Sequence, residues 1–439
     1  MKLDLDRALR VVDSARTAVI SGKVSEITGL VVRATIPGIR HGEMVEIERG
    51  GMAPLPAEVV GFRGDEAVLL PLGDPTGVGP DSAVSPRGRS LTLRCGEALL
   101  GRVLDGLGAP IDGGPPLDED ESLEDWAVER SAPDPLTRRR VESPLATGVR
   151  AIDGFLTLGE GQRIGLFAGS GVGKSTLLGQ IARCASADVN VICLVGERGR
   201  EVRDFIEDSL GEEGLKRSVI VCATSDAPSL VRLKSTYVAT AIAEWFRDRR
   251  GARVLMMVDS LTRFARAQRE VGLSAGEPPA RQGYPPSVFA ALPRLLERAG
   301  NSDTGSITAI YTVLVAGGDM EEPIADEVRG IVDGHIVLER ELGARGRWPA
   351  IDILHSVSRV MPSVSAADHV AAARRAREVL ATYEQNRDLI TLGAYKTGAD
   401  ARVDDAIRRI DGIESFLRQG TAETAAFDDA VSQLATLIR

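Results

Sequence analysis

A glycine-rich stretch that follows residue 168 has the residue types and spacing of a phosphate-binding loop. The apolar run 164–168 is typical of a strand, and a helix-forming sequence follows the loop directly. Glycines let successive backbone N–H groups turn toward a phosphate, and a helix N-terminus adds unpaired donors and partial positive charge. Lys174 would reach the β- and γ-phosphates, and the Ser175 hydroxyl would bind Mg²⁺. The motif begins with Ala168 instead of glycine, and a small residue still fits there. The pattern predicts a nucleotide site formed by Gly169, Ser170, Gly171, Val172, Gly173, Lys174, Ser175 and Thr176.

A carboxylate at the end of a second apolar run would complete this site. Residues 254–258 have the pattern of a buried strand, and Asp259 follows them. At that position a carboxylate can hold a water molecule of a bound Mg²⁺. Many apolar strands end in aspartate for no functional reason, but the combination with the phosphate-binding loop predicts that Asp259 is part of the metal site.

Glu197 and Arg198 close the apolar run that follows the loop and its helix. A glutamate there could polarise the water that attacks a γ-phosphate, and Arg198 could stabilise the charge that develops on it. Without the loop, the two would be a surface ion pair. Arg359 lies much later in the chain. The composition of the sequence around it indicates only an arginine in a loop.

The composition is that of a soluble, globular chain of two or three domains. Its 439 residues are 43% hydrophobic and 26% charged. No apolar run is long enough to span a membrane, and the N-terminus lacks the pattern of a secretory signal, so we expect a cytoplasmic protein. The net charge of −10 argues against a mainly electrostatic nucleic-acid footprint. The four cysteines and four histidines have no metal-ligand spacing, and we interpret the cysteines as small buried hydrophobic residues.

Changes in hydrophobic pattern divide the chain into three predicted domains. Short alternating segments in 19–72 predict a small β-barrel or sandwich within residues 1–92, preceded by an amphipathic segment, 3–12, that fits a helix or a frayed end. Apolar strands alternating with helices predict an α/β domain with a mostly parallel sheet within 93–360. Helical spacing predicts a helical bundle in 361–439. The Gly/Pro-rich stretch 71–86 is expected to link the first two domains, and 101–112 to form a turn-rich strand pair.

Several segments together resemble the ATPases of type III protein export, which are related to the catalytic head subunits of rotary ATP synthases. The similarity extends from about residue 20 to 365 and is carried by 168–176, 196–203, 259–270, 276–279 and 283–289. It implies an N-terminal β-barrel, a RecA-like P-loop domain and a C-terminal helical domain. It also implies hydrolysis of ATP with Mg²⁺.

The resemblance assigns roles to individual residues. It implies that Glu197 is the catalytic glutamate, Arg198 the phosphate-sensing arginine, and Arg263 an arginine close to the site. Arg359 would be the finger that reaches the site of the neighbouring subunit. Trp348 lies where the family usually has a tyrosine that stacks on adenine, and its larger ring offers a larger stacking face.

The same resemblance implies an assembly and its partners. A chain that carries both Glu197 and Arg359 can form a head-to-tail ring with a site at every interface, so we expect a homohexamer. The implied partners are export substrates and their chaperones, a stator-like regulator, a central stalk protein and the membrane export gate. The chain would then be cytoplasmic and peripheral at the inner face of the cytoplasmic membrane.

Three other functions share parts of this pattern. A catalytic subunit of a rotary ATP synthase has the same loop, but its acidic lever motif is not visible in 361–439. A hexameric RNA translocase of the termination-factor type would need stacking aromatics near the N-terminus, where Phe62 is the only aromatic in residues 1–90. A non-catalytic ring subunit would lack Glu197. Within export ATPases, segments 222–226 and 237–247 favour the injectisome over the flagellum.

Overall fold

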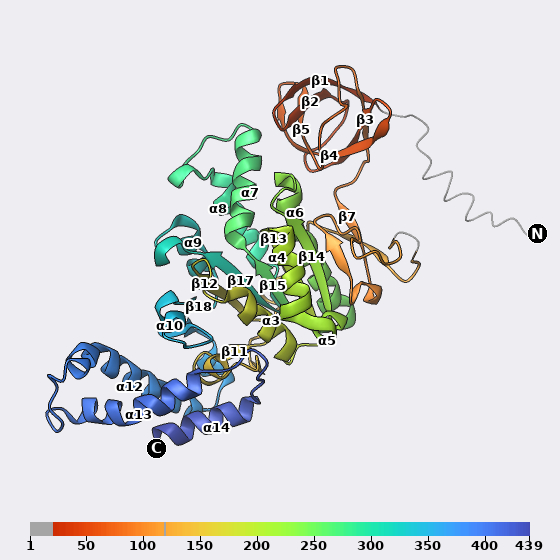
Figure 1. The fold of residues 1–439 in the computed structure, drawn as a ribbon. Helices are drawn as coiled ribbons and strands as arrows, with labels where there is room; N and C mark the ends of the chain where they lie inside the picture. The colour runs from red at the N-terminus through yellow and green to blue at the C-terminus, as the bar shows by residue number, and fades with distance from the viewer. Residues whose placement is uncertain (1–20, 118–119) are drawn as a thin grey trace, which may run out of the picture. The chain divides into compact units, whose positions relative to one another are not determined.

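The computed structural model describes residues 21–117 and 120–439, which form two compact units (Figure 1). Of the described residues, the first unit contains those up to Leu91 together with Ser274–Gly276, and the second contains those from Thr92 to Leu273 and from Glu277 to Arg439. The possible helix at 3–12 lies outside the described residues. The exact domain boundaries at 92/93 and 360/361 stay predictions.

The first unit contains a closed six-stranded barrel. Its strand order is β1-β2-β5-β4-β3-β6, and all neighbouring strands are antiparallel. Alternate residues of β2, such as Val32 and Ala34, are fully buried inside the barrel. The strands are β1 (Gly22–Thr28), β2 (Val31–Thr35), β3 (Met44–Arg49), β4 (Met52–Arg63), β5 (Glu66–Pro71) and β6 (Ala83–Pro86).

Strand β6 corrects one prediction about this unit. The Gly/Pro-rich stretch 71–86 was expected to be a linker, but its last four residues pair with both β1 and β3. Closure removes the exposed strand edges that an open sheet would leave, which explains why a stretch with little strand character is recruited.

The second unit is built around a nine-stranded sheet with the order β19-β18-β12-β17-β15-β13-β14-β8, with β16 paired to β17 beside this path. The strands from β18 to β8 are parallel to one another, whereas β19 and β16 run antiparallel to their neighbours. The ends of β12, β15 and β13 therefore meet at one edge of the sheet, where ligands bind in such folds. The strands are β8 (Val103–Asp105), β12 (Arg163–Ala168), β13 (Val189–Glu197), β14 (Ser218–Thr224), β15 (Arg253–Asp259), β16 (Gly300–Asn301), β17 (Ser306–Leu314), β18 (Gly334–Leu338) and β19 (Ile351–Ser358).

Two features of this sheet go beyond the sequence-based expectation. Residues 101–112 form the expected local pair, in which Leu104 bridges Pro110, and Val103–Asp105 also joins the edge of the main sheet beside β14. Strand β19 was not anticipated, because its polar residues and half-exposed pattern hide a strand that covers the edge beside β18. The two smaller pairs are β7 (Thr92–Cys95) with β9 (Glu124–Ala127), and β10 (Pro144–Leu145) with β11 (Leu158–Gly159).

Helices surround the sheet and shield its continuous apolar strands from water (Figure 1). All nine residues of β13 are buried, and α6, which packs on β13 and β14, buries most of its own residues. The helices of this part are α2 (Arg150–Phe155), α3 (Lys174–Cys184), α4 (Gly199–Asp204), α5 (Gly211–Lys216), α6 (Ser229–Arg250), α7 (Leu261–Ser274), α8 (Pro286–Leu296), α9 (Pro323–Ile331), α10 (Arg340–Ala344) and α11 (Met361–Val364).

Three further helices, α12 (Ala367–Thr391), α13 (Ala401–Leu417) and α14 (Phe427–Ile438), form the C-terminal part. Most residues of their apolar stripes are buried, as the helical spacing predicts, including Val403, Ala406, Ile413 and Leu434. Ile407, Phe427 and Val431 are half-buried. The core they form is continuous with that of the P-loop domain, where Phe416 packs edge-on against Phe155. The predicted fold class of barrel, RecA-like domain and helical bundle is confirmed.

Among the described residues, no helix is long and apolar enough to cross a membrane. The cysteine interpretation is right for Cys95, Cys193 and Cys222, which are buried. Cys184 is only half-buried, because it lies at the end of α3 against Thr424.

Candidate nucleotide-binding and catalytic site

The phosphate-binding loop joins β12 to α3 at the ligand-binding edge of the sheet. Gly171 and Gly173 have φ angles of 76° and 80°, a region that favours glycine, and α3 begins directly at Lys174. No side chain caps this helix, so its first backbone N–H groups are available to an anion. Ser175 and Thr176 are exposed at this end, whereas Val172 is buried beneath the loop. The local geometry suits the predicted phosphate site.

The side chain of Lys174 reaches the end of β15. Its ammonium donates to Asp259 Oδ1, and the same carboxylate oxygen accepts a hydrogen bond of 2.8 Å from Thr312 on the adjacent strand β17. Asp259 is 3% exposed, so a buried carboxylate is held in place from two sides. Parallel pairing of β12, β17 and β15 brings residues 85 positions apart in sequence into contact.

Glu197 ends β13 and faces the same site. Its Oε1 lies 3.9 Å from Lys174 Nζ, and its Oε2 accepts a hydrogen bond of 3.0 Å from Arg263 Nη2. Arg263 also donates to the carbonyl of Gly196, which fixes its position at the start of α7. The predicted lysine, glutamate, aspartate and arginine are therefore one connected cluster of charges.

Burial raises the pKa of Glu197 to about 7. A hydrogen bond with Glu201 and the negative charge of Asp259 add to this shift, while Lys174 and Arg263 oppose it. A carboxyl with a pKa near neutrality suits a group that handles the proton of an attacking water.

Arg198 does not join the cluster. Its side chain is 80% exposed and pairs at 2.6 Å with Glu201, one turn along α4. The same Glu201 hydrogen-bonds to Glu197, so it stands between the glutamate and the arginine that were predicted to act together.

Arg359 lies at the opposite end of the parallel strands, beside their amino ends. It follows β19, whose last residue Ser358 pairs with Gly334 at the beginning of β18. The phosphate loop, in contrast, follows Ala168, which pairs with Leu338 at the end of β18. The four steps along the strand from Gly334 to Leu338 span about 13 Å, so the exposed Arg359 cannot serve its own chain's loop.

Trp348 borders a cavity of about 270 Å³ beside the loop and the first turns of α3. Its ring packs over Gly173 so closely that a Cβ added there would lie 2.7 Å from the ring. Trp348 is 42% exposed, so a face of the indole remains accessible for stacking. The cavity is lined by Gly171, Gly173, Thr176, Leu177, Gln180, Trp348, Pro349, Gln419 and Thr421.

Several residues of the site were missed by sequence reasoning. Thr312 supports Asp259, Glu201 bonds to Glu197, and Arg340 on α10 donates a hydrogen bond of 3.0 Å to the carbonyl of Ser170 in the loop. Gln180 and Gln419 line the cavity. Glu201 lies four residues from Glu197, a spacing that could have been noticed. The others become neighbours only through sheet pairing or through the C-terminal helices.

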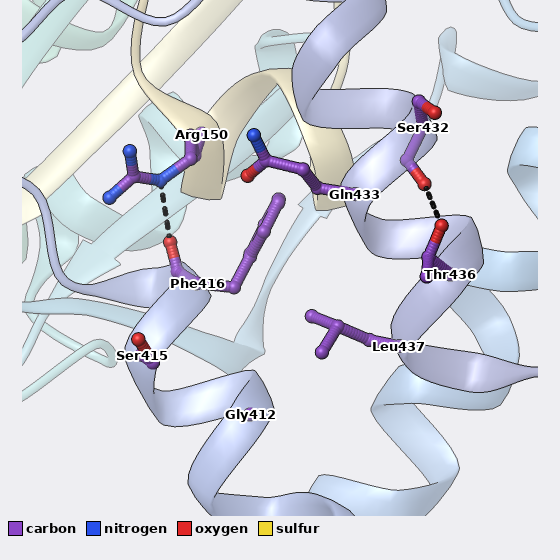
Figure 2. Close-up of a pocket in the computed structure, with 8 residues that line it drawn as sticks. All are labelled: Arg150, Gly412, Ser415, Phe416, Ser432, Gln433, Thr436 and Leu437. Carbon is purple, nitrogen blue, oxygen red and sulfur yellow. Dashed lines mark hydrogen bonds between the residues drawn. The ribbon is translucent and has the colours of Figure 1, made fainter.

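A larger cavity of about 540 Å³ lies between α13 and α14 (Figure 2). Arg150 at its edge donates to the Phe416 carbonyl at 3.0 Å, and Thr436 donates to the Ser432 carbonyl at 2.9 Å. These polar groups are engaged within the protein, and none of the predicted site residues lines the cavity. It is a surface groove of the helical part, separate from the cluster of charges.

The described residues contain no group of three or more His, Cys, Asp or Glu side chains arranged to hold a metal ion. The available metal-binding groups at the loop are the Asp259 carboxylate and the Ser175 hydroxyl. Such a small protein donor set fits Mg²⁺, which keeps several waters and binds largely through substrate phosphates.

Comparisons with known proteins identify two family models along the chain. Residues 148–358 match the nucleotide-binding domain of the ATP synthase alpha/beta family, and residues 365–436 match the C-terminal domain of the type III secretion ATPase EscN. The first match contains the loop, Glu197, Asp259 and Trp348, and the second contains α12, α13 and all but the last two residues of α14.

Individual relatives match nearly the whole chain. A type 3 secretion system ATPase of Xanthomonas euvesicatoria is 53% identical, over 95% of this chain and 93% of the relative. A flagellum-specific ATP synthase of Bacillus subtilis is 51% identical, over 95% and 94%. The structure of the assembled ATPase EscN from enteropathogenic E. coli has a TM-score of 0.89 at 45% identity, covering 95% of this chain and 100% of that one. A structure of EscN with its central stalk EscO gives 0.88 at 45% identity with the same coverage.

Proposed function

The chain belongs to the family of type III secretion and flagellum-specific ATPases, and from this membership we propose how its residues hydrolyse ATP and drive protein export. It is an ATP hydrolase.

The observation that carries the mechanism is the position of Glu197, a buried carboxylate beside Lys174 at the end of the strand that faces the phosphate loop. Glu197 orients the water that attacks the γ-phosphoryl group in line. Lys174 and the backbone N–H groups of the loop stabilise charge on the phosphate oxygens. Arg198 turns from Glu201 toward the phosphate when the nucleotide binds.

The Ser175 hydroxyl and the Asp259 carboxylate would hold Mg²⁺, the carboxylate through a water molecule. Its charge would neutralise the phosphate oxygens. Asp259 contacts Lys174 and Thr312 through Oδ1, and Oδ2 accepts no hydrogen bond from a described residue. That oxygen is the one we assign to the metal's water.

The site is completed by a second copy of the chain. Arg359 and the loop lie at opposite ends of the sheet's parallel strands. A head-to-tail ring therefore gives each interface a loop from one subunit and an Arg359 from the next. We propose that the ring contains six subunits. The assembled state of the relative EscN supports a ring.

We further propose that cycling of these sites detaches chaperones from export substrates and unfolds the substrates. The partners are a central stalk protein, as EscO is for EscN, a stator-like regulator and the membrane export gate. The protein would then act in the cytoplasm, peripheral to the inner face of the cytoplasmic membrane. The injectisome assignment stays a prediction, since relatives from both branches are 53% and 51% identical.

Two of the three alternative functions have less support from the chain's own features. The match of residues 365–436 to the EscN C-terminal domain favours export over a rotary ATP synthase. An RNA translocase would need a surface of basic and stacking residues, and the barrel contains a single aromatic, Phe62.

Phosphate release from ATP by the purified chain tests this proposal. We expect Glu197→Gln to reduce the turnover at least about a hundredfold with little change in ATP binding, because only the water-orienting group is lost. Glu207→Gln is the matched control, since Glu207 is an exposed partner of Arg203 on the surface. Near-normal turnover in Glu197→Gln would refute the assignment.

A further inference from the structure

The cavity beside Trp348 is closed on one side by residues 418–426, the connection between α13 and α14. Gln180 and Arg183 on α3 hold this connection through its backbone carbonyls. Gln419 donates its own backbone N–H to the Trp348 carbonyl at 2.8 Å. The connection is therefore tied both to the helix that follows the phosphate loop and to the residue proposed to stack on the base.

The amide of Gln180 is held in one orientation. Its Nε2 donates to the carbonyls of Gly420 at 3.2 Å and Glu423 at 3.0 Å, and two carbonyl acceptors require the NH₂ end of the amide there. The side chain is 2% exposed and lines the cavity. Its Oε1 accepts no hydrogen bond from any described residue, and this oxygen is accessible to solvent. A fixed acceptor is thus left over at the cavity.

The other polar groups of the cavity cannot select a base in this way. The Gln419 amide is used at both ends, because Nε2 donates to the Gly148 and Glu423 carbonyls and Oε1 accepts from the Arg150 N–H. The hydroxyls of Thr176 and Thr421 can each donate or accept, so they do not distinguish an amino group from an oxo group.

We propose that Gln180 determines base specificity by accepting a hydrogen bond from the exocyclic 6-amino group of adenine through Oε1. This inference rests on the proposed nucleotide site, with the phosphates at the N-terminus of α3 and the base against Trp348. A base with an oxo group at that position would place two acceptors against each other, and a buried acceptor without a donor is costly.

Binding of two nucleotides to the full chain tests this proposal. Purine riboside 5′-triphosphate differs from ATP only by lacking the 6-amino group, so stacking and phosphate contacts are unchanged. We expect the wild-type protein to bind ATP about tenfold more tightly than this analogue by calorimetry, and to show a similar ratio in kcat/KM. In Gln180→Met the ratio should fall to near one, because ATP binding weakens and analogue binding does not.

Arg183→Met is the matched control. Arg183 donates to the Thr421 carbonyl at 2.7 Å, so its loss loosens the same connection without removing a group from the cavity. This variant should keep the wild-type preference for ATP.

Three results would overturn the proposal. These are equal binding of the two nucleotides by the wild-type protein, an unchanged ratio in Gln180→Met, and an equal loss of preference in Arg183→Met. If Gln180→Met does not fold, wild-type binding of ATP against inosine 5′-triphosphate decides, because the threonine hydroxyls do not distinguish an amino group from an oxo group, and equal binding of these two nucleotides would overturn the proposal. If the wild-type protein hydrolyses both nucleotides equally well, only the role of Gln180 is refuted, whereas a failure to bind either would refute the nucleotide site as well.

Discussion

Glu197 and Arg359 lie at opposite ends of the parallel strands of one sheet. Glu197 is at the carboxyl end of β13, and Arg359, which follows the antiparallel strand β19, is beside the amino end of β18. In one chain the two cannot act on one phosphate. The parallel pairing from β18 to β13 sets this separation, so it is a property of the fold and not of a side-chain rotamer.

The first prediction is complementation between two inactive variants. Glu197→Gln and Arg359→Ala should each lose most ATP hydrolysis, because each removes one half of every shared site. Co-assembled at equal amounts, they restore both wild-type residues at roughly a quarter of interfaces, so activity should reappear on mixing. Phosphate release is the measurement.

The control is a tandem chain that joins the two variants, which excludes failure to mix. A tandem assembly without activity would contradict the shared site. So would an Arg359→Ala protein that retains most of its turnover.

The second prediction concerns pH. Because the pKa of Glu197 is raised to about 7 and the ionised carboxylate is the form that orients water, kcat/KM should rise between about pH 6 and pH 8. Folding raises the pKa of Glu197 above its value in the unfolded chain, so the protonated carboxyl stabilises the folded state at low pH. This stabilisation is lost as the pH rises through about 7. A pH profile of ATP hydrolysis gives the midpoint.

Replacing Glu201 should move that midpoint downward. The hydrogen bond with Glu201 raises the pKa of Glu197, so Glu201→Ala should lower the pH at which activity is half-maximal. Glu207→Ala, on the exposed surface, should leave the profile unchanged. A profile that is flat from pH 6 to 8 in the wild-type protein would disprove the assignment of this titration to Glu197.

The predictable part of the site consists of residues with strong local signals. Gly171, Gly173 and Lys174 belong to one contiguous motif, and Glu197 and Asp259 each end an apolar strand. Parallel strands place their ends at one edge, so strand pattern and motif together predict the cluster that the structure contains.

The unpredicted part depends on contacts between distant segments. Strand β6 exists because the barrel closes, and β8 because β14 offers a free edge, so neither has a strong local signal. The amide of Gln180 is oriented by carbonyls 240 and 243 residues away in sequence. The pairing of Arg198 with Glu201 is different, because it joins residues three apart in sequence, a spacing from which it could have been predicted.

The third prediction tests stacking by Trp348. Trp348→Ala should weaken ATP binding about tenfold, and Trp348→Tyr should weaken it less, since a smaller aromatic face remains. Calorimetry gives both dissociation constants. Trp245→Phe is the control, because Trp245 bonds to Glu124 and does not line the cavity. Equal affinities for the alanine and tyrosine variants would exclude stacking.

The fourth prediction concerns Mg²⁺. Chelation should abolish ATP hydrolysis and added Mg²⁺ should restore it. Asp259→Asn should raise the Mg²⁺ concentration for half-maximal activity at least about tenfold, because an amide holds the metal's water less strongly than a carboxylate. An unchanged Mg²⁺ dependence in this variant would show that Asp259 serves only to hold Lys174.

The last prediction concerns an ion pair far from the chemistry. Arg298 donates through Nε and Nη2 to both carboxylate oxygens of Glu244, at 2.8 and 2.7 Å, and their side chains are 2% and 1% exposed. Removing one partner leaves the other charge buried, so Glu244→Ala should destabilise the P-loop domain by about 3–5 kcal/mol. Urea unfolding followed by circular dichroism measures the loss. Replacing both residues, as Glu244→Leu with Arg298→Met, should recover much of the stability, because no unpaired charge remains. Glu207→Ala, which breaks an exposed pair, should cost less than about 1 kcal/mol. A Glu244→Ala loss as small as that of Glu207→Ala would mean that water reaches Arg298 in the folded protein.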